Sequence, residues 1–176
     1  MAIHCRGVTL IELMVALAVL VIILTLSLPS FTDLITRHRL KGATEKLYQD
    51  LQLGRSEAIK RGVEVSISFH PSSSVWCYGK SLHHSCDCTE KVNTRPDYCQ
   101  IDGVAKITDG AGHNGVSLID TTFTGDNTGF DPFRGISTDS GSVVFRSGGY
   151  STRIVVSGLG RVRICSDDDA LGYPSC

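Results

Sequence analysis

The sequence lacks the short motifs that mark the common classes of enzyme. It contains no Gly-x-Ser-x-Gly of the hydrolases, no phosphate-binding Gly-x-x-x-x-Gly-Lys-Ser/Thr and no zinc-binding His-Glu-x-x-His. No other set of residues suggests catalysis or a cofactor. We therefore expect a protein that is not an enzyme and that carries neither a cofactor nor a metal.

The chain also lacks a charge excess, since 17 lysines and arginines face 18 aspartates and glutamates. Net charge therefore neither indicates nor excludes a nucleic-acid partner, and only the distribution of charge is informative. No internal repeat and no low-complexity segment interrupts the 176 residues. This length fits one anchor segment and one domain of ordinary size.

An apolar run from Val8 to Leu28 dominates the N-terminal part and stops at Pro29. As a helix it would be roughly 31 Å long, enough for one hydrocarbon core. No Ala-x-Ala cleavage site follows it, so it differs from a secretory signal. Glu12 lies near its start, where a carboxylate at membrane depth costs about 2.5–3.5 kcal/mol and requires a partner.

The tract from Arg6-Gly7-Val8 to Glu12-Leu13-Met14 resembles the N-terminus of the type IV pilin and pseudopilin superfamily. The resemblance implies that a prepilin peptidase cuts between Gly7 and Val8 and methylates the new amino terminus of Val8. It also implies that Glu12 pairs with the terminal amine of a neighbouring subunit during assembly. Val8 departs from the phenylalanine usual at this position. The alternative is a monotopic anchor that tolerates one glutamate.

The same resemblance implies a division of the chain and a location. Residues 1–7 are then the leader, 8–28 the transmembrane segment, 29–62 an amphipathic continuation of the helix and 63–176 a periplasmic or extracellular β domain. The protein would cross the bacterial inner membrane once and pass from there into a pilus at the cell surface. Its implied partners are the membrane, other major and minor pilins, the prepilin peptidase and the inner-membrane assembly platform.

Periodicity predicts an α+β fold, with a long N-terminal helix packed on an antiparallel sheet. Leu40, Ala43, Leu47, Leu51, Gly54 and Ala58 form one stripe of a helix that Gly62 would cap. Alternation predicts a strand over 63–69, and later strands are expected at 116–123, 142–146, 151–157 and 161–165. We expect residues 70–100 to be a loop region pinned by disulfides. The segments 51–62 and 130–135 resemble the GspH/FimT branch of the pilins.

Six of the seven cysteines lie outside the leader, and an even number in an oxidising compartment predicts three disulfides. Cys165 and Cys176 stand apart from the others and are expected to pair with each other. The pairing within Cys77, Cys86, Cys88 and Cys99 stays open. A zinc site formed with His83 and His84 is the alternative, but the spacing matches no common zinc pair. Trp76 and Tyr78, on either side of Cys77, are expected to cover the core.

Arginines concentrate between residues 140 and 166, a segment that contains no aspartate or glutamate. Alternation along a strand would place Arg161 and Arg163 on one face, with backbones roughly 7 Å apart. This spacing is close to that of phosphates along a nucleic-acid strand, and guanidinium groups bind phosphate oxygens well. Arg146 and Arg153 are expected to assist from their position and charge.

Gly160-Arg161-x-Arg163 resembles the GRxR motif of FimT-type minor pilins, a subfamily linked to natural transformation. The resemblance implies that Arg161 and Arg163 bind double-stranded DNA and that Gly160 shapes the turn before them. Three alternatives stay open: a solvated sheet face neutralised by Asp167–Asp169, a structural minor pilin that primes assembly or adhesion, and a GspH-type pseudopilin of type II secretion.

Overall fold

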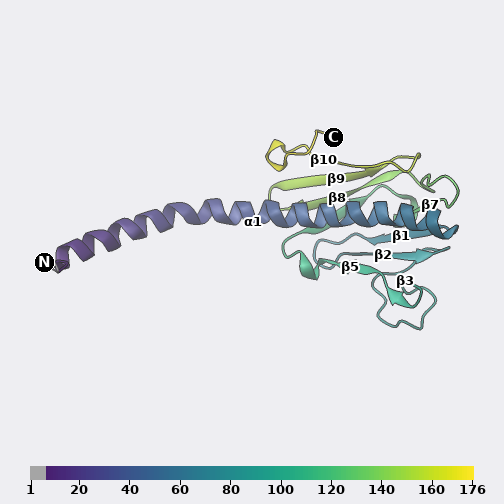
Figure 1. Ribbon diagram of the computed structural model, residues 1–176, viewed down its shortest axis with the longest axis horizontal. Helices are drawn as coiled ribbons and strands as arrows, with labels where there is room; N and C mark the ends of the chain where they lie inside the picture. Colours follow the sequence, from purple (N-terminus) through teal and green to yellow (C-terminus); the bar gives the residue numbers. More distant parts are fainter. Residues whose placement is uncertain (1–6) are drawn as a thin grey trace, which may run out of the picture. The chain divides into compact units, whose positions relative to one another are not determined.

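The computed structural model describes residues 7–176, apart from the side chains of residues 25–30. The predicted cleavage site at Gly7 and Val8 is included, whereas the rest of the predicted leader lies outside the described residues. Helix α1 runs from Leu10 to Arg61 (Figure 1). The chain forms two compact units, one up to Ile35 and one from Thr36 to Cys176, and each is described by itself.

The first unit is helical from Leu10 onward, and its large apolar side chains up to Leu24 are all at least half exposed. Among the described residues, we find no helix with a stretch both long enough and apolar enough to traverse a bilayer. The predicted transmembrane segment, residues 8–28, extends over residues 25–28, whose side chains lie outside the description.

In the second unit, α1 packs one stripe of side chains on the sheets. The stripe is the one that the sequence predicts, and its members are completely buried or nearly so: Leu40, Ala43, Leu47, Leu51, Gly54 and Ala58. The helix ends at Arg61 because Gly62 follows with a φ of +70°, the left-handed conformation that commonly closes helices.

Helix α1 packs against two four-stranded antiparallel sheets. The first has the order β5-β2-β1-β7, and the second has the order β10-β9-β8-β6. The strands of the first sheet are β1 (Val65–His70), β2 (Cys77–Leu82), β5 (Ile107–Asp109) and β7 (Asn127–Phe130). Those of the second are β6 (Ser117–Thr121), β8 (Gly141–Ser147), β9 (Tyr150–Val156) and β10 (Val162–Cys165).

Short elements complete the unit. Strands β3 (Gln100–Ile101) and β4 (Val104–Ala105) form a separate small ribbon. Three single turns of 3-10 helix are η1 (Gly110–Gly112), η2 (Thr124–Asp126) and η3 (Asp169–Leu171). The expectation of an antiparallel sheet behind a long helix is thus met by two sheets rather than one.

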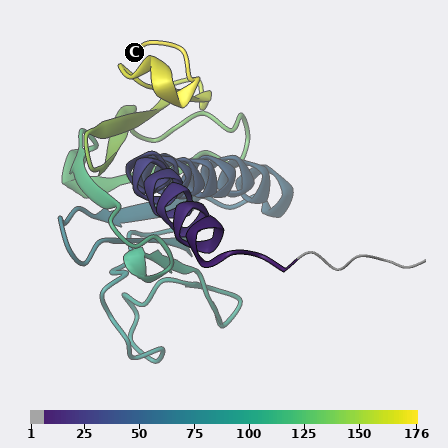
Figure 2. The same ribbon diagram turned by 90° about the vertical axis from the view of Figure 1, so that its left-hand side faces the viewer.

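The prediction that residues 70–100 are only a loop region was wrong, because β2 lies within them at the centre of the first sheet. Its sequence shows no apolar alternation because both of its faces are covered. Tyr78 and Lys80 reach Asp50 of α1 on one face, whereas Cys77 points to the other face. A disulfide-pinned lobe, residues 83–99, covers that second face. The lobe forms the loops at the bottom of Figure 2.

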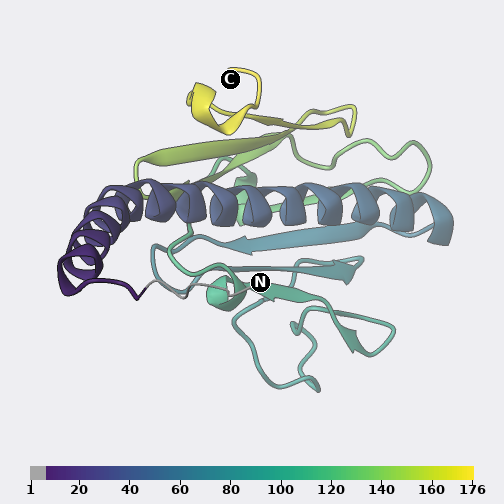
Figure 3. The same cartoon turned by 60° about the vertical axis from the view of Figure 1, so that its left-hand side comes forward.

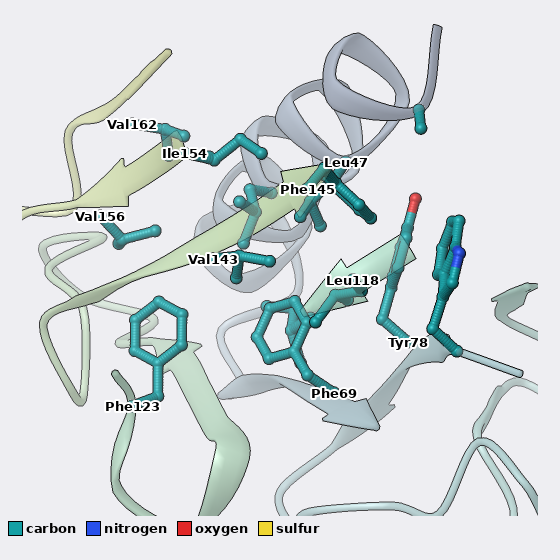
Figure 4. Close-up of a cluster of buried hydrophobic side chains, with 14 of the residues drawn as sticks. Leu47, Phe69, Tyr78, Leu118, Phe123, Val143, Phe145, Ile154, Val156 and Val162 are labelled. Carbon is teal, nitrogen blue, oxygen red and sulfur yellow. The ribbon is translucent and has the colours of Figure 1, made fainter. Parts of the chain in front are cut away.

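One continuous core joins α1 to both sheets. Figure 4 shows Leu47 of α1 in one cluster with Tyr78 and Phe69 of the first sheet and Phe145 and Ile154 of the second. Trp76 is 1% exposed and donates from Nε1 to the Val116 carbonyl at 2.7 Å. The aromatic residues around Cys77 therefore lie in the core.

The C-terminal tail is fixed to the helix and to the second sheet. Cys165 of β10 forms a disulfide with Cys176, the pair favoured by their position in the sequence. The Tyr173 hydroxyl donates to Glu45 of α1 at 3.1 Å, and Lys41 lies over its ring. Burial and the nearby Glu45 carboxylate raise the pKa of Tyr173 to about 12.

Candidate nucleic-acid interface

The second sheet places the four predicted arginines on one side. Arg163 lies opposite Val155, Arg153 opposite Cys165, and Arg146 opposite Ser151, and residues directly opposite each other share a face. Arg161 lies one residue before β10 and is exposed, while Val162 between the two motif arginines is buried. We call this side of the sheet, with Arg146, Arg153, Arg161 and Arg163, the arginine face.

The arginine face points away from the helix. Thr152, which alternates with Arg153 along β9, contacts Thr44 of α1 through hydroxyls 2.7 Å apart. The corresponding outer face of the first sheet is covered by the disulfide-pinned lobe, where Cys77 pairs with Cys88 and Cys86 with Cys99. Exposed guanidinium groups on the outer face of the second sheet are thus accessible to a large ligand.

Arg161 and Arg163 border an open groove of about 360 Å³. Its other lining residues are Val155, Ser157 and Leu159, so apolar side chains and the two arginines line the groove together. Among the described residues, no carboxylate lies within ion-pair distance of either arginine. Arg146 is also exposed, whereas Arg153 is partly buried and donates to the Ser142 hydroxyl at 3.2 Å.

The acidic run Asp167–Asp169 does not neutralise the motif arginines. Asp168 accepts from the Ser151 amide at 2.9 Å, at the beginning of β9, whereas Arg161 follows the end of that strand. Strand β10, which carries Arg163, ends at Cys165, so Asp167 lies beyond the strand that holds this arginine. Charge neutralisation by this run, one of the alternatives that the sequence left open, has no support from these contacts.

Gly160 is required by the turn that presents the arginines. The turn closes through Gly160 N, which donates to the Ser157 carbonyl at 2.8 Å, and Gly160 has a φ of +73°. A β-carbon at Gly160 would lie 2.0 Å from the Gly135 carbonyl oxygen. That oxygen accepts from Nε of Arg55 at 2.8 Å, so helix and turn are held together. Nothing in the sequence indicated this role of Arg55.

The cysteine and histidine constellation of the lobe forms disulfides. His84 contacts the Pro96 carbonyl through Nε2 at 3.0 Å, and His83 adopts a φ of +67° in the same loop. In the part of the chain that the structure describes, no three histidine, cysteine or acidic side chains are placed to share a metal ion. Cys77, Cys86, Cys88 and Cys99 are all paired in disulfides, which leaves none of their thiols free to bind zinc as the alternative requires.

Glu12 closes the start of α1. The Thr9 amide donates to Glu12 Oε2, and the Glu12 amide donates to Thr9 Oγ1, both at 3.4 Å. This reciprocal pair is a capping box, in which two helix-terminal amides find side-chain acceptors. Thr9 and Glu12 have the spacing that such a box requires, a signal in the sequence that the apolar run around them obscured.

A buried ionic network joins α1 to the first sheet and borders a second pocket of about 290 Å³. Asp50 accepts from the Tyr78 hydroxyl at 2.8 Å and pairs with Lys80 at 3.2 Å and Lys46 at 3.1 Å. Burial alone raises the pKa of Asp50, but the Lys80 charge and the bonds from Tyr78 and Lys46 outweigh burial. The pKa of this carboxyl consequently lies below its ordinary value.

We expect acid to weaken the fold through Asp50. In the unfolded chain this carboxyl titrates near its ordinary value of 3.8, and in the fold it titrates lower. Its contribution to stability is thus complete above pH 3.8 and is lost as the pH falls through the folded value. Urea titrations of the native chain and of Asp50→Asn over a pH series measure this contribution. The native chain and Asp50→Asn should differ less in free energy of unfolding below pH 3.8 than above it. A difference that stays constant over the pH series would contradict the prediction.

Two family models match the chain, one over most of the second unit and one over the N-terminal segment. Residues 43–160 match the family described as type II transport protein GspH, and residues 3–28 match the prokaryotic N-terminal methylation motif. Among solved structures, the minor pseudopilin EpsH from the type 2 secretion system of Vibrio cholerae is similar. It is 15% identical, with a TM-score of 0.46, over 73% of this chain and 97% of that one. No curated protein matches.

Proposed function

The chain belongs to the GspH family of the type IV pilin superfamily, and from this premise we propose that it binds double-stranded DNA for uptake in natural transformation. In this proposal it is a minor pilin, and DNA is held on the arginine face. The motif Gly160-Arg161-x-Arg163 supports the proposal through its resemblance to FimT-type minor pilins. Arg161 and Arg163 make the contacts, and Arg146 and Arg153 add to the local positive charge.

The observation that carries the proposal is the state of Arg161 and Arg163. Both guanidinium groups are exposed beside an open groove, and neither is engaged by a carboxylate among the described residues. By contrast, Arg61 pairs with Asp102 at 2.7 Å, and Arg95 pairs with Glu90 at 3.1 Å. A chain of near-zero net charge that leaves two neighbouring arginines uncompensated has a local site for an anion such as a DNA backbone.

Binding of this kind is independent of base sequence and weak for one subunit. Phosphate contacts position a protein on DNA but read no bases. Non-specific dissociation constants lie in the range of roughly 10⁻⁴–10⁻⁶ M at physiological salt. Several subunits along one filament would raise the overall affinity by engaging the same DNA at once.

The N-terminal part supplies anchoring and assembly in this proposal. Residues 8–28 hold the protein in the bacterial inner membrane with the β domain in the periplasm, before it joins a pilus with other pilins on the assembly platform. Prepilin peptidase cleaves between Gly7 and Val8 and methylates Val8. Glu12 then exchanges its capping bond to Thr9 for the terminal amine of a neighbouring subunit, since opposite charges relieve each other's desolvation.

The family description favours a second candidate function. The matched family is named for type II transport, so a pseudopilin of a type II secretion system is the alternative, with protein rather than DNA as cargo. A structural minor pilin that primes assembly or adheres at the tip is a further alternative. Loss of DNA uptake with intact pili, after substitution of Arg161 and Arg163, would support the DNA proposal; loss of pili or of secretion would support the others.

The direct test compares DNA binding by the full chain in a neutral detergent with that of the Arg161→Gln/Arg163→Gln variant. We expect the native chain to bind two duplexes of unrelated sequence equally and to lose affinity as salt rises. Each phosphate contact contributes about −0.9 to the slope of log K against log salt. The variant should therefore bind roughly 10- to 100-fold more weakly at low salt, with a slope shallower by about two.

The matched control is Arg61→Gln/Arg95→Gln, which changes the net charge equally but removes arginines that carboxylates already engage. This control should leave DNA binding almost unchanged. Equal losses in both variants would mean that only total charge matters, and an undiminished affinity in the Arg161/Arg163 variant would remove the arginine face from the mechanism.

A further inference from the structure

Two exposed apolar side chains lie at the end of the domain where α1 ends. Phe133 is 88% exposed and Leu159 is 78% exposed, the two largest exposures among the large apolar residues of the second unit. Each occupies a tight turn, residues 131–135 after β7 and residues 157–160 between β9 and β10. We call these two turns the double turn; Figure 1 and Figure 3 place both beside the C-terminal end of α1.

Hydrogen bonds make each turn rigid. Asp131 Oδ1 accepts from the amides of Phe133 at 3.0 Å and Arg134 at 2.8 Å, and the Gly135 amide closes the turn onto the Asp131 carbonyl at 2.9 Å. In the other turn, the Ser157 hydroxyl accepts from the Arg161 amide at 3.2 Å. These hydrogen bonds fix the backbone of both turns. Phe133 and Leu159 are therefore exposed on ordered turns rather than on a mobile loop.

The turns are also fixed to each other. Ser137 donates from its amide to the Gly158 carbonyl at 3.2 Å and from its hydroxyl to the Ser157 carbonyl at 2.9 Å. Gly160 packs directly on the Gly135 carbonyl, which Arg55 also contacts. The double turn is thus one rigid projection with two apolar tips.

An exposed arginine lies close in sequence to each of the two apolar tips. Arg134 follows Phe133 directly, and Arg161 lies two residues after Leu159. The nearest carboxylate along the chain, Asp131, is occupied by the backbone amides of its own turn. In the described part of the chain, Arg134 has no carboxylate within ion-pair distance. The projection therefore combines apolar tips with positive charge close to both of them.

We propose that the double turn enters the minor groove of duplex DNA, with Leu159 and Phe133 against sugars and base edges. This inference rests on the proposed DNA function and names the part of DNA that the site takes. Arg161 and Arg163 contact the backbone of one strand along the groove bordered by Leu159, and Arg134 contacts the backbone of the other strand. Proteins that bind the minor groove use arginine or lysine side chains and frequently insert apolar side chains between base steps.

Geometry favours the minor groove over a single strand. Proteins that hold single strands lay the bases on aromatic platforms within a concave, positively charged channel. Here the aromatic residue is at the tip of a projecting turn, and the residue on the neighbouring tip is a leucine, which offers no π face. The minor groove is about 6 Å wide and is walled by sugars, so exposed apolar side chains can contact sugars and base edges there while arginines reach the phosphates on either side.

The test measures binding of the full chain, in a neutral detergent, to a duplex and to its separate strands, for the native chain and for Phe133→Ser/Leu159→Ser. We expect the variant to bind the duplex roughly tenfold more weakly through lost apolar contact, with an unchanged salt slope because no phosphate contact is removed. Leu53→Ser/Val75→Ser, which alters two other exposed apolar residues, should have no effect. Arg134→Gln should make the salt slope shallower by about one.

Competition on an A·T-rich duplex with netropsin, which occupies the minor groove at A·T pairs, separates the outcomes. We expect netropsin to displace the native chain from the duplex. Binding of single strands as tight as binding of the duplex, no competition, or no loss in Phe133→Ser/Leu159→Ser would each overturn the minor-groove assignment. If duplex binding still depends on Arg161 and Arg163, the DNA function survives that result; if it does not, both proposals fail.

Discussion

Replacing Asp50 with alanine is expected to lower the free energy of unfolding by about 3–5 kcal/mol, the cost of removing one partner of a buried ion pair. The side chains of Asp50 and Lys80 are 8% and 10% exposed, and the Tyr78 hydroxyl also donates to Asp50. The substitution leaves an uncompensated ammonium and an unpaired phenol between α1 and β2. Urea unfolding can be followed by the fluorescence of the single tryptophan, Trp76, which is 1% exposed.

The double variant Asp50→Leu/Lys80→Met separates loss of the pair from loss of the fold. Because it removes both charges and keeps apolar volume, it should recover most of the stability that Asp50→Ala loses. A loss below about 1 kcal/mol for Asp50→Ala would indicate an exposed, screened pair and would contradict the buried network. If Asp50→Leu/Lys80→Met were as unstable as Asp50→Ala, the unpaired charge of Lys80 would not be the cause of the lost stability.

Replacing Gly160 with alanine is expected to lower the free energy of unfolding by more than about 3 kcal/mol and to abolish DNA binding. The left-handed conformation costs a residue with a β-carbon about 1–2 kcal/mol. The larger cost is steric, because the new methyl group would lie 2.0 Å from the Gly135 carbonyl oxygen, which Arg55 holds in place. Relief of this overlap requires the two halves of the double turn to separate, which displaces Arg161.

Gly158→Ala is the matched control, since it lies two residues away in the same turn and its β-carbon would meet no atom within 4 Å. It should change neither stability nor binding by a measurable amount. Equal behaviour of the Gly158 and Gly160 variants in urea unfolding and in DNA titrations would refute the packing role assigned to Gly160.

Local patterns in the sequence predicted those features that depend on near neighbours. The stripe from Leu40 to Ala58 repeats with the period of a helix, so its burial follows from the spacing alone. Arg161 and Arg163 are exposed around a buried Val162 because a strand alternates its side chains. The exposure of the motif arginines therefore follows from the alternation of the residues around them.

The sequence did not reveal β2, although it lies at the centre of the first sheet. Its residues Cys77 to Leu82 lack apolar alternation, because Asp50 of a distant helix compensates Lys80 on one face and the disulfide-pinned lobe covers the other. Strand propensity depends on such neighbours more than on the strand itself. The pairing of Asp50 with Lys80 could not be predicted either, because it depends on the packing of α1 against β2.

The long helix, its buried stripe, the alternation along the late strands and the positive charge near Gly160 could all be predicted from the sequence, because each depends on spacing within one segment. The position of four arginines on one face, with the exposed side chains of Phe133 and Leu159 on neighbouring turns, became apparent from the folded chain. Those arrangements depend on strand register and on contacts between Arg55, Gly135 and Gly160, residues far apart in the chain. Packing between distant segments selects one partner among many, and no local pattern records that choice.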